Sequence, residues 1–595
     1  MDGADFDADD HSTLALSLVT TYGRVMPLLW LAVCQAELVA GRRKDCAPKI
    51  AAPTPMASAP GKQSIVAEVD LEIAMTTSAD SPSMGEAPPA KDRGARAAPP
   101  PLADLYHSVL ALRDEVVSAG AATMALWKDS IHRDEFRPGA ENLANYLALR
   151  HHDLTELQAG LSAYGLSSLG RSEARVRTAL DTLLATLARL SGLAKPEYPP
   201  LLRVSDGERA LREEQDRILG HDPGGAKSLI MVTLPTEAAC DRELLRRLMI
   251  AGANCVRINC AHDNAKIWAD MIARVRSVAS ELERDCRVLM DIAGPKCRIE
   301  SLLGPEKIRL RRGDAFALVK EARKSDKDDE ILATITFPEI LDSLEVGAEV
   351  SIDDGKIGAR VVSAKPGEVK LTVHRVPAGG ARLKPEKGVN FPKTELHLPP
   401  LTKDDLLALD FVAEHADLVG FSFVQRSSDV ALLDRELIRR RPDGPLLPIM
   451  LKIETRLGVR NLPQLIVEAA GRRPLAVMIA RGDLAVELGF GRMSEMQEEI
   501  LWLCDAAHVP VIWATQVLDN FVRDGAPTRA EATDAAMSQR AECVMLNKGL
   551  YLVDAVVFLK DVLNRMERHQ SKETALLGLL HSWGDLAIKS DGARL

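Results

Sequence analysis

Short apolar runs alternate with amphipathic segments over the C-terminal two thirds of the chain. Most of these runs are continuously apolar, which is typical of parallel strands buried on both faces. They lie at 229–233, 255–259, 288–291, 418–423, 449–454, 476–480, 511–515 and 543–547. Helical patterns such as 242–250 and 494–507 lie between them. Eight strand and helix units predict an α/β fold of the TIM (β/α)8 barrel type.

The third and fourth predicted strands are separated by more than a hundred residues. Short β-rich runs at 308–310, 348–352, 357–363 and 369–373 alternate there with turns that contain Gly and Asp. This segment is too long for a loop and has a β pattern of its own. We therefore expect an inserted small β-barrel domain that acts as a lid.

The residues before the barrel have two further patterns. Segment 47–101 is rich in Ala, Pro and Ser and has no aromatic residue, as in a disordered linker. From 102 to 193, apolar residues recur at helical spacing, which predicts an α-helical domain of about four helices. Within it, the turn-rich segment 158–171 is a candidate surface for an unknown partner.

These patterns divide the chain into six segments. They are a leader and disordered linker at 1–101, an α-helical extension at 102–200, the first part of the barrel at 226–301, the inserted β domain at 302–389, the second part of the barrel at 390–571, and a C-terminal tail at 572–595. The leader contains one apolar run, 25–33, which is shorter than the ~20 residues that span a membrane. We therefore expect no membrane anchor.

Composition excludes several classes of protein. The 75 Lys and Arg residues and 85 Asp and Glu residues are interspersed and give a net charge of −10, so no basic stripe suits a nucleic acid. The nine cysteines form no CxxC pair or Cys/His cluster, which favours free thiols in a cytoplasmic protein. The sequence leaves the oligomeric state open, a homo-oligomer included.

Polar side chains gather at the C-terminal ends of the predicted strands, where TIM barrels carry their reactive groups. They are Arg257, Asn259, Asp291, Lys452, Glu454, Arg481, Gly482, Asp483, Thr515 and Gln516. Any one of them could be part of a surface salt bridge, but five strand ends together argue against coincidence. Cations, carboxylates and a hydroxyl around one mouth suit a small anionic substrate held by a divalent cation.

Eight segments resemble signature segments of the pyruvate kinase family. They are VRINCAHD, MDIAGPKCRIE, SIDDGKI, KGVNFPKTELHLPPLTKDD, LKIET, IARGDLAVELG, WATQVLDN and APTRAEATD, and they follow the order of the family. The resemblance runs from about Ser228 to Lys560, and the last three segments together are highly specific. It implies a glycolytic enzyme that transfers a phosphoryl group from phosphoenolpyruvate to ADP, which gives pyruvate and ATP.

The resemblance also implies roles for the residues at the strand ends. Lys452 matches the lysine beside the transferring phosphoryl group, and Arg257 matches the arginine that holds the phosphate. Glu454 and Asp483 match the ligands of Mg²⁺ or Mn²⁺. The remaining matches are Gly482 and Asp483 with backbone N–H groups for the substrate carboxylate, Thr515 near the carbon that is protonated, Asp354 on the lid, and Asn259, His262 and Arg298 on the nucleotide side.

The nucleotide side departs from the family pattern at three places. The family's Ser-Gly-Glu-Thr-Ala segment is replaced by LNKG at 546–549, its Thr-Lys pair by IA at 292–293, and a serine by Ala261. A different phosphoryl acceptor and a non-catalytic paralogue therefore stay open as alternatives. The chain also ends about 35 residues after Lys560. Most members continue there into a regulatory domain, so we expect regulation by sugar phosphates to be absent.

Lys296 bears on whether the protein requires a monovalent cation. In the family, K⁺ is held at the positions of Asn259, Ala261, Asp291 and Ile292, and two of these residues lack a side-chain oxygen. Family members that need K⁺ commonly have glutamate at the position of Lys296, whereas members that do not need it have lysine. We expect the Lys296 ammonium to replace the monovalent cation, so that K⁺ is not required.

Overall fold

The computed structural model describes residues 99–193, 195–304, 308–323 and 330–567. Residues 1–94 and 95–595 form separate units, and all described residues belong to the second unit. The predicted linker, the apolar run at 25–33 and the C-terminal tail lie outside the described residues. Among the helices of the described residues, none is long and apolar enough to cross a membrane.

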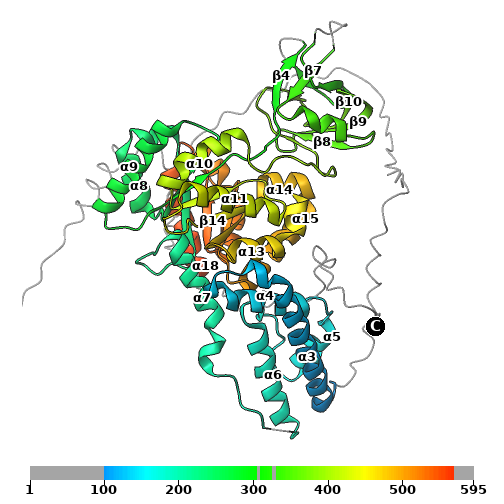
Figure 1. The fold of residues 1–595 in the computed structure, drawn as a ribbon, viewed down its shortest axis with the longest axis vertical. Coiled ribbons are helices and arrows are strands. Elements are labelled where there is room, and N and C mark those ends of the chain that lie inside the picture. The colour runs from blue at the N-terminus through cyan, green and yellow to red at the C-terminus, as the bar shows by residue number, and fades with distance from the viewer. Residues whose placement is uncertain (1–98, 194, 305–307, 324–329, 568–595) are drawn as a thin grey trace, which may run out of the picture. The chain divides into compact units, whose positions relative to one another are not determined.

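Eight parallel strands close into a barrel, as the apolar runs predicted (Figure 1). In barrel order they are β1 (Leu229–Thr233), β17 (Cys543–Leu546), β16 (Val511–Ala514), β15 (Leu475–Ala480), β14 (Ile449–Ile453), β13 (Leu418–Phe421), β3 (Arg287–Asp291) and β2 (Cys255–Asn259). Nearly all their side chains are buried, because one face fills the barrel and the other meets the surrounding helices. The predicted fold class is confirmed.

Helices cover the barrel between successive strands. The longer ones are α8 (Arg242–Ala251), α9 (Ala265–Glu281), α10 (Lys403–His415), α11 (Ser427–Arg440), α13 (Leu462–Ala470), α15 (Phe490–Ala506), α17 (Arg529–Met537) and α18 (Leu552–Glu567). Capping boxes start two of them: Thr402 and Asp405 at α10, and Thr528 and Glu531 at α17. These caps satisfy the free N–H groups of the first turn and fix where each helix begins.

Helix α7 (Asp206–Leu219) closes the N-terminal end of the barrel. Ile218 and Leu219 join a buried apolar cluster with side chains from the barrel interior. The Cys255 thiol donates a hydrogen bond to the Leu219 carbonyl at 2.9 Å, and Gln215 donates to the Glu542 carbonyl at 3.3 Å. The polar residues of the predicted site lie at the opposite end of the strands.

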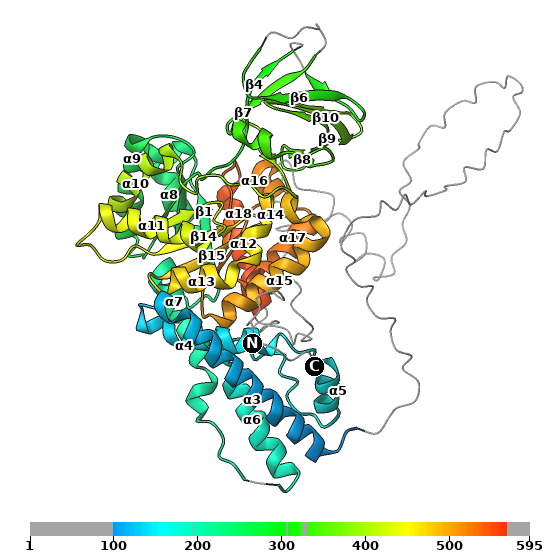
Figure 2. The ribbon, with the colours of Figure 1, turned by 45° about the vertical axis from the view of Figure 1, so that its right-hand side comes forward.

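The helical extension contains α3 (Leu102–Trp127), α4 (Arg137–Leu149), α5 (Thr155–Ala163) and α6 (Val176–Leu190) (Figure 2). It packs against the barrel helices and shares one apolar core with them. Arg133 donates to the carbonyls of Ala470 and Arg473 at 3.1 and 2.7 Å. A Cβ on Gly139 would lie 2.4 Å from the Ala507 carbonyl, so the two backbones touch.

The insert forms a seven-stranded mixed sheet with its own apolar core. Its order is β12 (Val389–Asn390), β8 (Glu349–Ile352), β9 (Ile357–Lys365), β10 (Glu368–Arg375), β6 (Ala315–Val319), β7 (Leu332–Ile335) and β4 (Ile299–Leu303). A short second ladder joins β5 (Arg309–Leu310) to β11 (Ala381–Arg382). The sheet begins at Ile299, slightly before the predicted start at 302, and it includes four strands, β4, β6, β7 and β12, that the sequence pattern did not reveal.

Candidate active site

Four charged side chains from three strands meet at the C-terminal mouth of the barrel. Arg257 lies on β2, Asp291 ends β3, and Lys452 and Glu454 lie at the end of β14. Arg257 donates from Nε and Nη2 to Oδ2 of Asp291 at 2.9 and 2.6 Å. The Lys452 Nζ lies 3.3 Å from the same oxygen and 3.1 Å from Oε1 of Glu454. The structure thus brings four of the predicted residues together, with Asp291 between the two cations.

Burial and charge shift the pKa values of this cluster in opposite directions. Burial acts to lower the pKa of Lys452, but the charges of Asp291 and Glu454 outweigh it and raise this pKa above its ordinary value. Burial acts to raise the pKa of Asp291, but Lys452 and Arg257 hold it below its usual value. Burial raises the pKa of Glu454, and the nearby Asp483 charge adds to this effect against the opposing charge of Lys452. The lysine therefore stays positively charged in a site that excludes most water.

Two residues that the sequence did not single out hold the cluster in place. The Ser422 Oγ accepts a hydrogen bond from Lys452 at 2.7 Å and donates to the Ile292 carbonyl at 2.8 Å. The Phe423 N–H donates to Oε2 of Glu454 at 2.6 Å, and Phe423 has a left-handed φ of 56°. Both residues follow β13, whose sequence has no charged residue to mark it as part of a site. Their role becomes apparent only in the folded barrel, where β13 pairs with β14.

Glu454 and Asp483 form the pair of carboxylates predicted to hold a divalent cation. Asp483 lies in the first turn of α14 (Arg481–Leu488). Each carboxylate lies next to a lysine, at 3.1 Å for Lys452 and 2.9 Å for Lys296. Within the described residues, no group of three or more His, Cys, Asp or Glu side chains is placed to hold a metal. Two carboxylates fit Mg²⁺, which is commonly held by one or two carboxylates together with substrate oxygens and water.

Both connections between the barrel and the insert reach Asp483 of this carboxylate pair. Lys296 precedes the insert, and its Nζ contacts Oδ2 of Asp483. Asn390 ends the insert, and its Nδ2 lies 3.5 Å from Oδ1 of Asp483 and 3.3 Å from Oε1 of Glu487. A Cβ on Gly388 would lie 3.1 Å from Cε of Lys296, so the returning strand packs on the lysine stem. The position of the lid is therefore coupled to the predicted metal site.

Gly482 and Thr515 are packed against each other. A Cβ on Gly482 would lie 2.8 Å from Cγ2 of Thr515, so no larger residue fits without movement. Thr515 has a φ of 70°, which is unusual for a β-branched residue. Arg481 holds this backbone in place, since its Nε donates to the Ala514 carbonyl at 2.9 Å and its Nη2 donates to the Thr515 carbonyl at 2.7 Å. Arg481 also pairs with Asp534.

A hollow of about 150 Å³ lies beside Arg257, on the predicted nucleotide side. Asn259, His262 and Thr233 line it together with Asn547 and Lys548, which follow β17. Burial lowers the pKa of His262, and the Lys548 charge lowers it further, which favours the neutral imidazole. Lys548 is exposed and forms no ion pair with any residue that the structure describes. Its ammonium is therefore available to an anionic ligand.

Arg298 and Asp354 lie on the insert, apart from the charged cluster. Arg298 donates to a carbonyl of the insert at 2.9 Å, and it does not line the hollow, although its charge acts on His262. Asp354 is exposed in the turn between β8 and β9, with a φ of 51°. The next residue, Gly355, lies against α14, because a Cβ there would be 3.8 Å from Cγ2 of Val486. The turn thus approaches the helix that carries Asp483.

A barrel with buried cations and a carboxylate pair at its C-terminal mouth defines an enzyme-like site for an anionic ligand and a divalent cation. A family model described as the pyruvate kinase barrel domain matches residues 226–556, and the chain belongs to the pyruvate kinase family.

Curated relatives are named as pyruvate kinases. The pyruvate kinase of Geobacillus stearothermophilus is 33% identical over 357 residues, which cover 58% of this chain and 57% of the relative. The enzyme of Thermococcus litoralis is 31% identical over 366 residues, which cover 60% and 73%. The pyruvate kinase PKLR of Rattus norvegicus is 30% identical over 345 residues, which cover 56% and 58%. The matched part of the chain thus spans little more than half the length of the first and third of these relatives.

Proposed function

We propose that this protein transfers the phosphoryl group of phosphoenolpyruvate to ADP, giving pyruvate and ATP. The observation that supports this most strongly is the buried cluster of Arg257, Asp291, Lys452 and Glu454 beside Asp483, in a barrel of the pyruvate kinase family. Phosphoryl transfer needs fixed positive charge around a group whose negative charge is redistributed in the transition state. The cluster supplies this charge before any substrate binds.

Each residue has a place in this reaction. Arg257 and Lys452 hold the phosphoryl group of phosphoenolpyruvate, and Lys452 also lies against the bridging oxygen that becomes the enolate oxygen. The bond from this oxygen to phosphorus breaks as a terminal phosphate oxygen of ADP bonds to phosphorus. The enolate then takes a proton at carbon on the side of Thr515. A divalent cation, Mg²⁺ or Mn²⁺, held by Glu454 and Asp483, would neutralise charge on the phosphoryl oxygens.

Lys296 replaces the monovalent cation in this proposal. Its ammonium lies 2.9 Å from Asp483, which is close enough to add a fixed positive charge beside the metal carboxylates. Ile292 is fully buried and supplies no side-chain oxygen, and Ala261 supplies none either. The enzyme therefore works without added K⁺.

The nucleotide lies on the side of Asn259, His262 and Arg298, and Asp354 closes over the site from the lid. Lys548 lines the same hollow and contacts the phosphates of the acceptor. The seven cysteines within the described residues are free thiols, as expected in the cytoplasm. We also propose that the protein can form a homo-oligomer and that its helical extension binds an unknown partner. We expect it to bind neither membranes nor nucleic acids.

A coupled assay tests the function directly. The full-length protein is supplied with phosphoenolpyruvate, Mg²⁺ and ADP, or with GDP, UDP or CDP, and pyruvate is measured. We expect pyruvate with ADP, and none from the Lys452→Met variant under the same conditions. Pyruvate only with another diphosphate would instead show that the acceptor differs. No pyruvate with any nucleotide would refute the proposal in favour of a different acceptor class or a non-catalytic role.

A further inference from the structure

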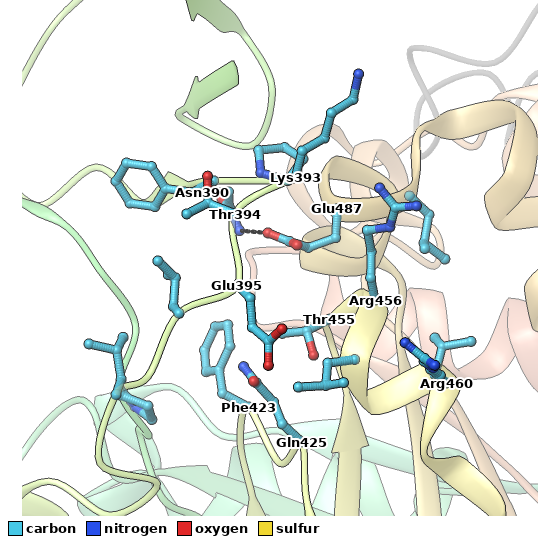
Figure 3. A pocket seen from close by; sticks show the side chains of 18 of the residues that line it. Asn390, Lys393, Thr394, Glu395, Phe423, Gln425, Thr455, Arg456, Arg460 and Glu487 are labelled. Carbon is cyan, nitrogen blue, oxygen red and sulfur yellow. Dashed lines mark hydrogen bonds between the residues drawn. The ribbon is translucent and has the colours of Figure 1, made fainter. Parts of the chain in front are cut away.

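A further cavity lies away from the barrel mouth, beside the segment that returns from the lid to the barrel. It has a volume of about 530 Å³, within the usual range for small-molecule sites. Figure 3 shows its two walls. One is the chain that returns from the insert, with Asn390, Thr394 and Glu395, and the other is formed by barrel helices that carry Arg456 and Arg460.

Three carboxylates line this cavity, and each already accepts a hydrogen bond from a neighbouring residue. Glu395 pairs with Arg426 at 2.5 Å. Asp429 accepts from the N–H groups of Gln425 and Arg426 at 3.0 and 2.9 Å, which caps α11. Glu487 accepts from Asn390 at 3.3 Å. Glu395 is thus paired with Arg426, and the charge of Arg456 acts on Glu487, but none of the three carboxylates forms an ion pair with Arg456 or Arg460.

Arg456 and Arg460 carry the uncompensated positive charge. They lie four residues apart on α12 (Arg456–Arg460), so both side chains extend from the same side of the helix. Both are exposed, and neither forms an ion pair with any described residue. Lys393 also belongs to the lining, but Figure 3 shows its ammonium extending away from the two arginines. A pair of guanidinium groups is suited to bidentate binding of phosphate or carboxylate.

Part of the lining of the cavity is apolar. Phe423, Leu457, Val459 and Leu488 line it. An inorganic ion would leave this surface in contact with water, whereas an organic anion would cover it. We propose that the hinge cavity, between the strand that returns from the lid and α12, binds a small organic anion with an apolar body and a phosphate or carboxylate group.

The position of the cavity makes it an effector site. Arg456 follows the predicted metal ligand Glu454 by two residues, and Asn390 contacts Asp483. An anion that bridges the two walls would therefore fix the hinge of the lid next to the metal carboxylates. By reciprocity, occupancy of the barrel mouth and of the hinge cavity would each alter the affinity of the other. This proposal does not depend on which acceptor receives the phosphoryl group.

Direct binding to the full-length protein tests the proposal. Isothermal titration calorimetry with phenyl phosphate, phthalate and inorganic phosphate distinguishes a phosphate ester, a dicarboxylate and a bare anion. We expect phenyl phosphate or phthalate to bind at least tenfold more tightly than inorganic phosphate. In the Arg456→Gln/Arg460→Gln variant, this binding should weaken at least tenfold.

Two further variants locate the site. Arg439→Gln/Arg565→Gln removes the same charge from exposed positions outside the cavity and should bind as the wild type does. Arg257→Gln disrupts the barrel mouth and should retain binding. The proposal is overturned if no organic probe binds, if the Arg456 and Arg460 variant binds normally, or if binding is lost in Arg257→Gln instead. None of these readouts requires turnover, so they stay separate from the test of the proposed reaction.

Discussion

The barrel mouth has two halves that are organised differently. In the metal-side half, formed by the ends of β3, β14 and β15, Asp291, Lys452, Glu454 and Asp483 each contact an opposite charge within 3.3 Å. In the acceptor-side half, formed by the ends of β1, β2 and β17, Lys548 is exposed without an ion pair among the described residues. The first half is preorganised by the protein, whereas the second depends on its ligand to complete it.

This difference indicates which half can change during evolution. Loss of one member of a buried charge network leaves another charge without a partner in a low-dielectric site, at a cost of several kcal/mol. Loss of an exposed group around the hollow carries no such cost in free energy. The departures at Ala261 and at 546–549 fall on the acceptor-side half, whereas the departure at 292–293 follows Asp291 on the metal-side half and leaves the charged residues there unchanged. Substitutions in each half in turn test whether the two halves differ in this way.

The largest effect is expected from Lys452→Met. This change removes the positive charge that we propose stabilises the transition state, and it leaves Asp291 and Glu454 without their shared partner, so kcat should fall by about a thousandfold or more. Steady-state kinetics at saturating substrate measure this loss. Lys365→Met, at an exposed position on the insert, is the control and should keep full activity. A kcat within tenfold of the wild type would remove Lys452 from the chemistry.

A smaller loss is expected from Gly482→Ala. The added methyl group would lie 2.8 Å from Cγ2 of Thr515 and push apart two residues of the predicted substrate site. Displacement of this kind can lower kcat/KM by about a hundredfold. Gly491→Ala, where no atom lies within 4 Å of the new Cβ, is the matched control. Addition of Thr515→Ser removes the clashing methyl group and should restore part of the activity, which a general folding defect would not allow.

Lys296→Glu should reduce activity by about tenfold, and added K⁺ should not restore the lost activity. The variant places a third carboxylate beside Glu454 and Asp483, while Ala261 and Ile292 still lack oxygens to hold the ion. Activity is titrated with KCl against tetramethylammonium chloride at constant ionic strength. The wild type should show a flat response. Tenfold activation of the wild type by K⁺, about 1.4 kcal/mol, would show that Lys296 does not replace the ion.

Lys548→Met tests the acceptor-side half and should have a milder effect. We expect KM for ADP to rise severalfold while KM for phosphoenolpyruvate stays unchanged, because an exposed cation contributes modestly to phosphate binding. Lys560→Met is the control on α18. An equal rise in both KM values would mean that the two halves are not independent.

The sequence predicted the metal-side half better than the surroundings that position it. Arg257, Lys452 and Glu454 stand out because charged residues are rare at the ends of buried apolar strands. Ser422 and Phe423 did not stand out, since their role arises from the contact between β13 and β14. The strands β4, β6, β7, β11 and β12 of the insert were also missed, and for β6 and β7 the reason is related. Residues such as Ala317 and Thr334 are buried by tertiary packing in the insert rather than marked by a strong alternating pattern.

The helical pattern of the extension was evident, but its packing was not. Gly139 and Asn142 look like ordinary helical positions in the sequence. In the structure, Gly139 allows close approach to Ala507, and Asn142 donates to the Ala506 carbonyl at 2.8 Å. Contacts between segments so far apart in the chain have no local signature, so the sequence alone suggested a more independent domain.

The last expected effect is on stability and not on turnover, and it concerns Glu487, which links the metal-side half to the lid. Burial raises its pKa from 4.5 to about 7, Asn390 opposes this rise, and the Asp483 charge adds to it. The folded protein thus binds this proton more tightly than the unfolded chain does. The resulting stabilisation is fully present below about pH 4.5 and is lost as the pH rises through 7, so the free energy of unfolding should fall by about 3 kcal/mol over this range.

Glu487→Gln should remove this pH dependence, because glutamine resembles the protonated acid at every pH. Thermal unfolding followed by circular dichroism should give similar Tm values for variant and wild type at pH 5, and a higher Tm for the variant at pH 8. Glu495→Gln, at an exposed position on α15, should follow the wild type throughout. A Tm difference that stays constant between pH 5 and 8 would mean that Glu487 is already ionised at pH 5. In that case the hydrogen bond from Asn390 at the end of the lid to Glu487 would involve a full negative charge, and lid closure would not respond to pH near neutrality.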